Sequence, residues 1–183
     1  MIDINKRMSL ISEIVKQKPS LGKTAIMKFI YILQQVYKVP IGYDYEIYTY
    51  GPYSAGVTED IQLAVNFNAI SMDTVTFPSG HMGYELKPTE FIDCIIDKGQ
   101  DFISTHRDSI SEVISKFGDK TVKELELSST IIYVYNMYLY NEWGNSIDEI
   151  SESVRKIKPH FSIDVIKDEC NNLNKLGIFE MST

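Results

Sequence analysis

Residues 43–54 read Tyr-Asp-Tyr-Glu-Ile-Tyr-Thr-Tyr-Gly-Pro-Tyr-Ser, and they decide the fold that we expect for this chain of 183 residues. Aromatic and polar residues alternate as far as Tyr50, and this period of two predicts a β-strand over residues 43–50. Gly51 and Pro52 predict a turn, and Ser54 is suited to cap a following helix. The stretch therefore predicts a strand, a turn and the start of a helix.

Two amphipathic helices are predicted before this stretch. Apolar residues recur at helical spacing over residues 4–16, and Pro19 with Gly22 ends that helix. Pro40 and Gly42 end the second helix, which has the strongest helical pattern in the chain. Its apolar stripe consists of Ile26, Phe29, Ile30, Leu33, Val36 and Tyr37.

A third helix and a hairpin are predicted after it. The helix covers residues 54–68, and the strand-like residues 70–77 and 82–86 are joined by Pro-Ser-Gly at residues 78–80. Three helices followed by a hairpin are the order of a winged helix, in which the hairpin is the wing. We therefore expect residues 1–87 to form a winged-helix-like unit.

The second half of the chain has an almost purely helical pattern. A long apolar pattern opens at Pro88, breaks near Thr105 and ends at Gly118. Capping residues and breakers then mark three further helices; they are Thr121, Ser146, Pro159, Ser162 and Gly177. Thr121 with Glu124, and Ser146 with Glu149, have the spacing of a capping box. The sequence thus predicts a mostly α protein of the α+β class, with a helical bundle over residues 88–183 packed on the first unit. Residues 118–121 are a weaker candidate boundary.

Composition favours a soluble, cytoplasmic protein, because 44% of the residues are hydrophobic and 23% are charged. The longest apolar runs, residues 29–33 and 131–135, fall far short of the roughly 20 residues that a membrane-spanning helix needs. We see no signal peptide, and we expect no membrane partner. Cys94 and Cys170 lie within apolar helical patterns, which predicts buried free thiols in a reducing compartment.

The charge pattern favours a protein partner over DNA. The net charge is −7, although the first 38 residues are basic overall. The third predicted helix, which would enter DNA, carries Glu59 and Asp60 and has no Lys or Arg as far as Asn68. A helix that reads DNA needs cations for the phosphates. A DNA-binding winged-helix transcription regulator that uses Lys23 and Lys28 is the alternative.

No converging reactive groups are visible. His81, His106 and His160 are far apart and lack metal-ligand spacing, and we expect His81 to be exposed in the wing. There is no nucleophile elbow and no phosphate-binding loop. The sequence predicts a protein that is not an enzyme, with no cofactor and no metal. An enzyme with a site across the tyrosine-rich segment is a third interpretation.

The twelve tyrosines are more informative, since five of them lie between residues 43 and 53. A tyrosine combines a large apolar ring with a polar tip, which suits both core packing and recognition surfaces. The tyrosines could therefore line the core or form a protein-binding groove, and the sequence allows both interpretations. Asp44 and Glu46 beside the rings would repel phosphate, so stacked nucleic-acid bases fit this segment less well.

Two motifs resemble a known family. Lys28, Ile30 and Tyr31 lie in a Lys-rich hydrophobic helix, and a strand later ends in Tyr-Gly-Pro at residues 50–52. With these motifs, residues 8–87 resemble the YwgA-like bacterial proteins, which are similar in turn to the Panacea, or SocA-like, antitoxin domain. Panacea domains commonly place a small aliphatic residue after Gly-Pro, whereas Tyr53 and Ser54 follow here, as in the YwgA type.

The resemblance implies a protein that neutralises a toxin by direct binding and has no catalytic residue. We therefore expect a non-enzymatic protein-interaction module, most concretely an antitoxin or a defence-related regulator. The acidic second half predicts a partner with a basic surface, such as an RNA-binding toxin. The sequence leaves the oligomeric state open. The residues expected to bind the partner, or to support the binding surface, are Lys23, Lys28, Tyr31, Tyr48, Tyr50, Gly51, Pro52, Tyr53 and Ser54.

Overall fold

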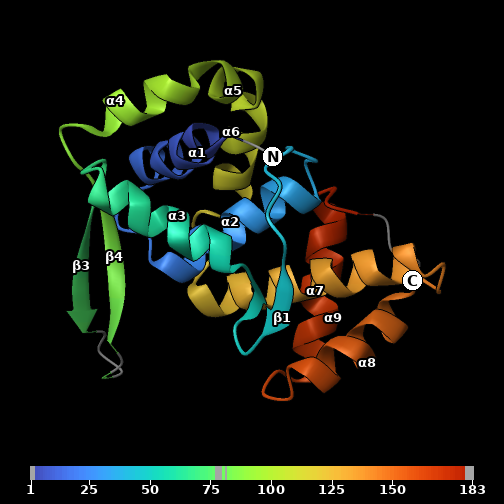
Figure 1. The fold of residues 1–183 in the computed structure, drawn as a ribbon. Coiled ribbons are helices and arrows are strands. Elements are labelled where there is room, and N and C mark those ends of the chain that lie inside the picture. Colours follow the sequence, from blue (N-terminus) through green and yellow to red (C-terminus); the bar gives the residue numbers. More distant parts are fainter. Residues whose placement is uncertain (1–2, 77–79, 81, 180–183) are drawn as a thin grey trace. The chain divides into compact units, whose positions relative to one another are not determined.

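A computed structural model describes residues 3–76, 80 and 82–179, and its elements follow the order shown in Figure 1. The fold is mostly helical and of the α+β type, with two small two-stranded sheets. The predicted wing residue His81 and the predicted turn residues Pro78 and Ser79 lie outside the described residues. No helix among the described residues is long and apolar enough to span a bilayer.

The chain divides into two units, and the tyrosine-rich stretch at residues 43–54 contributes to both of them. Unit 1 consists of Met1–Glu46 and Tyr53–Asp119, and unit 2 consists of Ile47–Pro52 and Lys120–Thr183. The helices that follow Pro88 therefore group with unit 1 as far as Asp119. The division after Asp119 falls within the weaker of the two boundaries that the sequence suggests.

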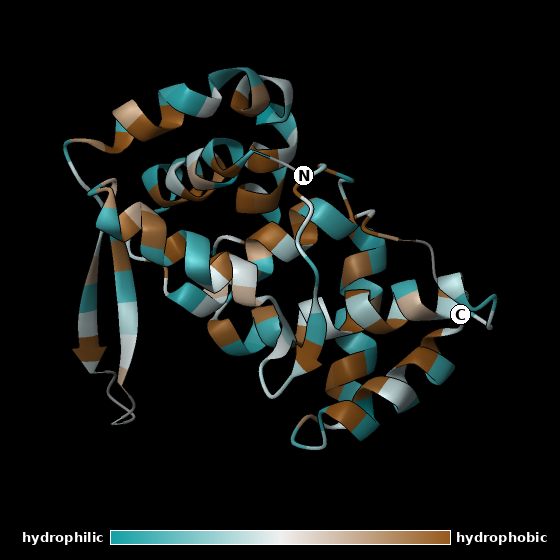
Figure 2. Cartoon of the chain, in the orientation of Figure 1, coloured by the Kyte–Doolittle hydropathy of each residue, from teal (hydrophilic) through white to brown (hydrophobic). Residues whose placement is uncertain are grey.

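Unit 1 is built around its first helix. The helices of the unit are α1 (Ile4–Gln17), α2 (Lys23–Gln35), α3 (Ala55–Asn66), α4 (Ile92–Ile96), the short 3₁₀ helix η1 (Asp97–Gly99), α5 (Gln100–Thr105) and α6 (Arg107–Phe117). α1 contacts α3 as well as α4, η1 and α5, and α2 contacts α6 (Figure 1). In both units brown and teal residues alternate along the helices (Figure 2), as amphipathic helices require.

The helical pattern after Pro88 breaks where the sequence predicts and at one further place. The break near Thr105 is confirmed, since α5 ends there. The additional interruption is η1, which ends at Gly99. A side chain at Gly99 would bring its Cβ within 2.7 Å of the Ser9 hydroxyl on α1, and that hydroxyl donates to the Ile95 carbonyl at 2.7 Å. The chain can thus lie directly against α1 only because residue 99 is a glycine.

The predicted hairpin is confirmed in the described residues. β3 (Ile70–Thr76) pairs antiparallel with β4 (Met82–Pro88), in a register that sets Ile70 opposite Pro88. β4 also pairs with the chain that leads into α2, through an isolated bridge between Leu86 and Leu21. Leu86 is fully buried, so the root of the hairpin belongs to the core of unit 1.

The strand predicted over residues 43–50 is wrong in its extent. The structure has β1 (Glu46–Tyr48) and β2 (Gly51–Tyr53), and the turn lies at residues 49–50 instead of at Gly51-Pro52. The reason is a side chain: Gln34 Nε2 donates to the Tyr43 carbonyl at 2.7 Å, and the Tyr43 amide donates to Gln34 Oε1 at 2.9 Å. The backbone of Tyr43 is therefore paired with α2 rather than with a strand.

The expectation that both thiols are buried holds for Cys170 and is wrong for Cys94, which is exposed. α4 turns Ile92, Ile95 and Ile96 towards the core, which leaves Cys94 on the opposite face of the helix. Burial raises the pKa of the Cys170 thiol to about 11.

Unit 2 contains the helices α7 (Val122–Tyr140), α8 (Ile147–Ile157) and α9 (Ile163–Lys175). The predicted capping box of Thr121 and Glu124 is confirmed at the start of α7. Ser146 and Ser162 also cap their helices. At Ser146 the capping box is incomplete: the Glu149 amide donates to the Ser146 hydroxyl at 3.3 Å, but the Glu149 carboxylate accepts from that hydroxyl, at 2.8 Å, instead of from the Ser146 amide.

A buried lysine holds residues 47–52 within unit 2. Lys158 is 1% exposed, and its Nζ lies 2.7 Å from Glu126 Oε1 on α7. The same Nζ donates to the carbonyl oxygens of Thr49 and Tyr48. Two residues further on, Gly51 lies against α7 with a left-handed backbone, at φ +87°. The turn of the β1–β2 hairpin is thus held by the Lys158 ammonium and by the close approach of the Gly51 backbone to α7.

Replacing Gly51 with alanine should destabilise the protein. A Cβ there would lie 3.0 Å from Thr130 Oγ1 and 3.2 Å from Ser129 Oγ, and the positive φ alone disfavours a side chain. We expect a loss of about 2–3 kcal/mol in the free energy of unfolding, measured by urea denaturation. Gly177→Ala is the control, because Gly177 also has a positive φ but no atom within 4 Å of its Cβ position. Equal losses of stability in the two variants would show that the close contact of a residue-51 side chain with α7 does not add to the cost of the positive φ.

Removing the Lys158 side chain should destabilise the protein more strongly. Lys158→Ala leaves the Glu126 carboxylate buried without its cation, which typically costs about 3–5 kcal/mol. Lys156→Ala is the matched control, because Lys156 is exposed on α8, the helix whose C-cap is Lys158. The measurement is again the free energy of unfolding in urea. A loss no larger than that of the control would contradict the structural role of this ion pair.

Candidate functional site: a tyrosine-lined pocket

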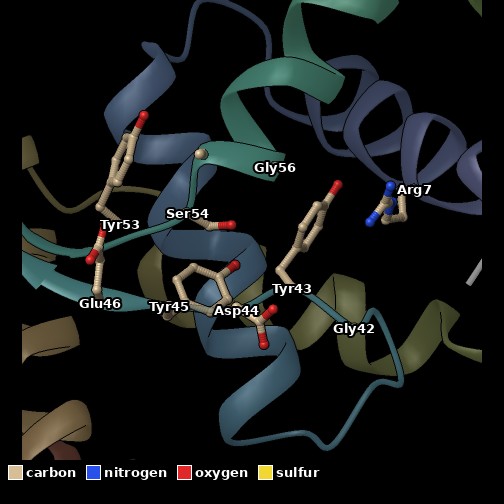
Figure 3. A pocket seen from close by; sticks show the side chains of 10 residues that line it. Arg7, Gly42, Tyr43, Asp44, Tyr45, Glu46, Tyr53, Ser54 and Gly56 are labelled. Atoms are coloured by element: carbon tan, nitrogen blue, oxygen red, sulfur yellow. The ribbon is translucent and has the colours of Figure 1, made fainter. Parts of the chain in front are cut away.

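A pocket of about 410 Å³ opens in unit 1 where the tyrosine-rich segment meets α1 and the start of α3 (Figure 3). Three short pieces of chain supply its walls: one residue of α1, the segment that leads into β1, and the junction of β2 with α3. The lining residues are Arg7, Gly42, Tyr43, Asp44, Tyr45, Glu46, Tyr53, Ser54, Ala55 and Gly56.

Asp60 does not line this pocket, but it holds two lining residues, Arg7 and Tyr43, in place. It lies on α3 and is 3% exposed. The Tyr43 hydroxyl donates to Asp60 Oδ2 at 2.6 Å, and Arg7 Nε lies 2.9 Å from the same oxygen. The Arg7 guanidinium also lies over the Tyr43 ring, 4.9 Å from its centre. A cation of α1 and a phenol of the segment before β1 thus stabilise the buried carboxylate of α3.

The two inner phenols of the pocket are held in the neutral form. Burial raises the pKa of Tyr43 far above its ordinary value, and the hydrogen bond to Asp60 raises it further. Burial also raises the pKa of Tyr45 well above its ordinary value, and nearby Tyr31 adds to the effect. Because a phenolate is absent near neutral pH, Tyr43 acts as a hydrogen-bond donor to Asp60, and Tyr45 contributes its apolar ring.

Aromatic packing fixes the position of the Tyr45 ring. Its centre lies 4.9 Å from that of Tyr31 on α2, in an edge-to-face arrangement, and 6.5 Å from that of Tyr43. Edge-to-face pairs are favourable because the positive edge of one ring meets the negative face of the other. The tyrosine cluster therefore presents a preformed wall.

The start of α3 forms the opposite wall. Ser54 occupies the N-cap position, as predicted, but its side chain makes no capping hydrogen bond. The residue is 4% exposed, and its hydroxyl points towards Tyr43 in Figure 3. Gly56 keeps this wall close to the ring, since a Cβ there would lie 3.2 Å from Tyr43 Cδ1.

The nine residues expected to bind a partner are distributed over both units. Tyr53 and Ser54 line the pocket, and Tyr31 supports it through Tyr45. Lys28 is 2% exposed, and the Lys23 ammonium lies 4.1 Å from the centre of the Tyr84 ring. The other four residues lie in the part of the β1–β2 hairpin that belongs to unit 2, where Tyr48 and Tyr50 are exposed and Gly51 and Pro52 are buried. Their role in binding stays a prediction.

The structure adds site residues that the sequence did not single out. Arg7, Gln34 and Asp60 position Tyr43, yet each lies in a different helix. Asp60 carried a recognisable signal: it follows Val57 by three residues and so lies on the apolar face of its own helix. A carboxylate on such a face needs a buried partner. Its partner Arg7, 53 residues away in the sequence, carried no comparable signal.

A second hollow lies in unit 2, between the starts of α7 and α9, with a volume of about 750 Å³. Several of its charged side chains already have partners. Glu169 is held by Lys120 at 3.0 Å and by Ser128, and Lys123 lies over the Phe161 ring. The pocket of unit 1 is therefore the better candidate site.

Comparison with known protein families finds no family that matches this chain, and comparison with curated proteins finds no matching relative. The resemblance to the YwgA-like proteins stays a prediction. Function is consequently argued from the pocket itself.

The buried phenols predict that alkaline pH destabilises the protein. An unfolded phenol ionises near about pH 10, whereas Tyr43 and Tyr45 keep their protons to higher pH when folded. Above about pH 10 the unfolded chain binds fewer protons than the folded chain, so the free energy of unfolding falls as the pH rises. Each buried phenol contributes a slope of up to about 1.4 kcal/mol per pH unit, and the stabilisation is complete below about pH 10.

Urea denaturation between about pH 8 and about pH 11 measures this slope. Tyr43→Phe should make the slope shallower, because one of the two groups is removed. Tyr140→Phe is the control, since it removes the same hydroxyl from a side chain that is 88% exposed. An equal change in both variants would contradict the assignment.

Proposed function

We propose that this chain is a non-enzymatic protein-interaction module that works in the cytoplasm by binding another protein directly. The observation that carries this proposal is the tyrosine-lined pocket, whose buried charged groups are committed to one another. Tyrosine rings with polar tips are the side chains that dominate protein–protein interfaces. The pocket therefore offers contact area and hydrogen bonds in place of a reactive group.

The chemistry of the pocket supports binding rather than catalysis. A nucleophile or general base needs access and a pKa close to the working pH. Tyr43 and Tyr45 have pKa values raised away from that range, and Asp60 is occupied by Arg7 and Tyr43. What these groups supply is a rigid, aromatic surface.

The arrangement of unit 1 supports a winged-helix-like unit that is used for protein contacts. α1, α2 and α3 precede the β3–β4 hairpin, which takes the place of a wing. Burial of Lys28 removes one of the two cations on which DNA binding would depend, and Lys23 contacts Tyr84. On the exposed face of α3, Gln62 donates to Asn66 at 3.1 Å, and Glu59 is acidic. This surface suits a protein better than a phosphate backbone.

An antitoxin or a defence-related regulator is the most concrete form of this proposal. It is supported by the resemblance of residues 8–87 to the YwgA-like proteins and by the net charge of −7. A negative chain speeds its encounter with a partner that has a basic surface.

A pull-down of the tagged chain from its native host, with nuclease treatment, tests this proposal. We expect one protein partner in stoichiometric amount, identified by mass spectrometry, and no enriched nucleic acid. The pocket variant Tyr53→Ala should lose the partner, whereas Tyr140→Ala, exposed in unit 2, should retain it. Thermal melting checks that Tyr53→Ala is folded.

Two outcomes would contradict the proposal. Salt-sensitive DNA without a protein partner would favour the transcription regulator, since phosphate contacts weaken steeply as salt rises. A protein partner that binds folded Tyr53→Ala as well as the unchanged chain would show that the pocket is not the interaction surface.

A further inference from the structure

The charges that face the tyrosine-lined pocket are predominantly negative. Arg7 is its one basic lining residue, and Asp60 already neutralises it at 2.9 Å. Asp44 and Glu46 also line the pocket; both are exposed, and neither is paired with a described residue. Two carboxylates are therefore left to attract a cation.

One cation, the side chain of Arg7, is already bound at the pocket by an aromatic ring and a carboxylate. The guanidinium of Arg7 lies against the face of Tyr43 and pairs with the Asp60 carboxylate. Beside this site, Tyr45 and Tyr53 provide further ring surface, and Asp44 and Glu46 provide carboxylates (Figure 3). A second basic side chain would meet the same combination of groups there. Arginine suits it better than lysine, because a planar guanidinium stacks on rings and forks onto carboxylates.

Ser54 provides an independent sign of a ligand. Its side chain is buried, points into the pocket and makes no hydrogen bond to any described residue, although an N-cap serine normally bonds to its own helix. The first amides of α3 are left without that capping bond as well. A peptide carbonyl satisfies a hydroxyl and amides of this kind without adding negative charge beside Asp44 and Glu46.

We infer that this pocket binds an extended peptide segment of the partner that carries an arginine. The arginine lies between the rings of Tyr45 and Tyr53 and pairs with Asp44 and Glu46, while the backbone carbonyl beside it bonds to Ser54. A volume of about 410 Å³ fits one side chain with its flanking backbone. This inference rests on the proposed function, because it assumes that the occupant of the pocket is a protein.

Titration of the full chain with synthetic peptides, followed by NMR, tests the inference. The probes are acetylated, amidated Gly-Ser-Arg-Ser-Gly and the same peptide with Lys, Gln or Glu in place of Arg. We expect the Arg peptide to saturate and to shift the amide signals of residues 42–46 and 53–56. The Lys peptide should bind more weakly, and the Gln and Glu peptides should leave these signals unchanged.

The double variant Asp44→Asn/Glu46→Gln should weaken binding of the Arg peptide about tenfold or more, through loss of both carboxylates. Ser54→Ala should weaken it by a smaller factor. Glu59→Gln, which neutralises an exposed carboxylate outside the lining of the pocket, is the control and should bind normally. The amide spectra report directly whether each variant is folded.

Other results would overturn the inference. Stronger binding of the Glu peptide or of inorganic phosphate would mean that Arg7 and the start of α3 form an anion site. Absence of saturable shifts with every peptide would remove the arginine assignment. It would leave the proposed function standing if Tyr53→Ala still loses a protein partner, whereas capture of nucleic acid alone would remove both.

Discussion

One buried carboxylate, that of Asp60, is the interaction on which the candidate site depends. A charge at this depth is tolerated only because Arg7 lies 2.9 Å away and the Tyr43 hydroxyl donates to it at 2.6 Å. These bonds join α1, α3 and the chain before β1 at a single point. Gln34 adds α2 through its two bonds to the Tyr43 backbone. The rings of Tyr43 and Tyr45 are thereby held in place in the free chain, and this preorganisation would lower the entropy lost if the proposed partner binds.

The tyrosine-rich stretch is secured separately within each unit by a buried charge. Of its outer residues, Tyr43 is fixed in unit 1 by Asp60. Its middle, residues 47–52, is fixed in unit 2 by Lys158, which pairs with Glu126 and donates to two carbonyl groups. The Tyr-Gly-Pro motif at residues 50–52 thus has a structural explanation that is independent of any partner. Gly51 permits the left-handed backbone and the close approach to α7 that its place in unit 2 requires.

The proposed function follows from the pocket side chains that these interactions leave without a partner among the described residues. Arg7, Asp60 and Tyr43 are occupied with one another, whereas Ser54, Asp44 and Glu46 retain hydrogen-bonding capacity within the same pocket. Rigid rings, unpaired carboxylates and an unused N-cap hydroxyl suit the recognition of a basic peptide. Reactive chemistry at Asp60 itself would require its release from Arg7 and Tyr43, which would leave an uncompensated buried charge.

Local patterns were sufficient wherever neighbours in the sequence decide the structure. Helical periodicity predicted the helices, the spacing of Thr121 and Glu124 predicted a capping box, and strand-like residues on either side of a turn predicted the β3–β4 hairpin. The same reasoning made the strand at residues 43–50 too long, because the Gln34 side chain of α2 binds the Tyr43 backbone. It also predicted a buried Cys94, whereas the packing of α4 leaves that residue exposed. The tyrosine cluster with its acidic neighbours was visible in the sequence by itself. Only the tertiary structure made it a pocket, because the pairing of Arg7 with Asp60 across 53 residues depends on how α1 and α3 pack, and no local pattern encodes that contact.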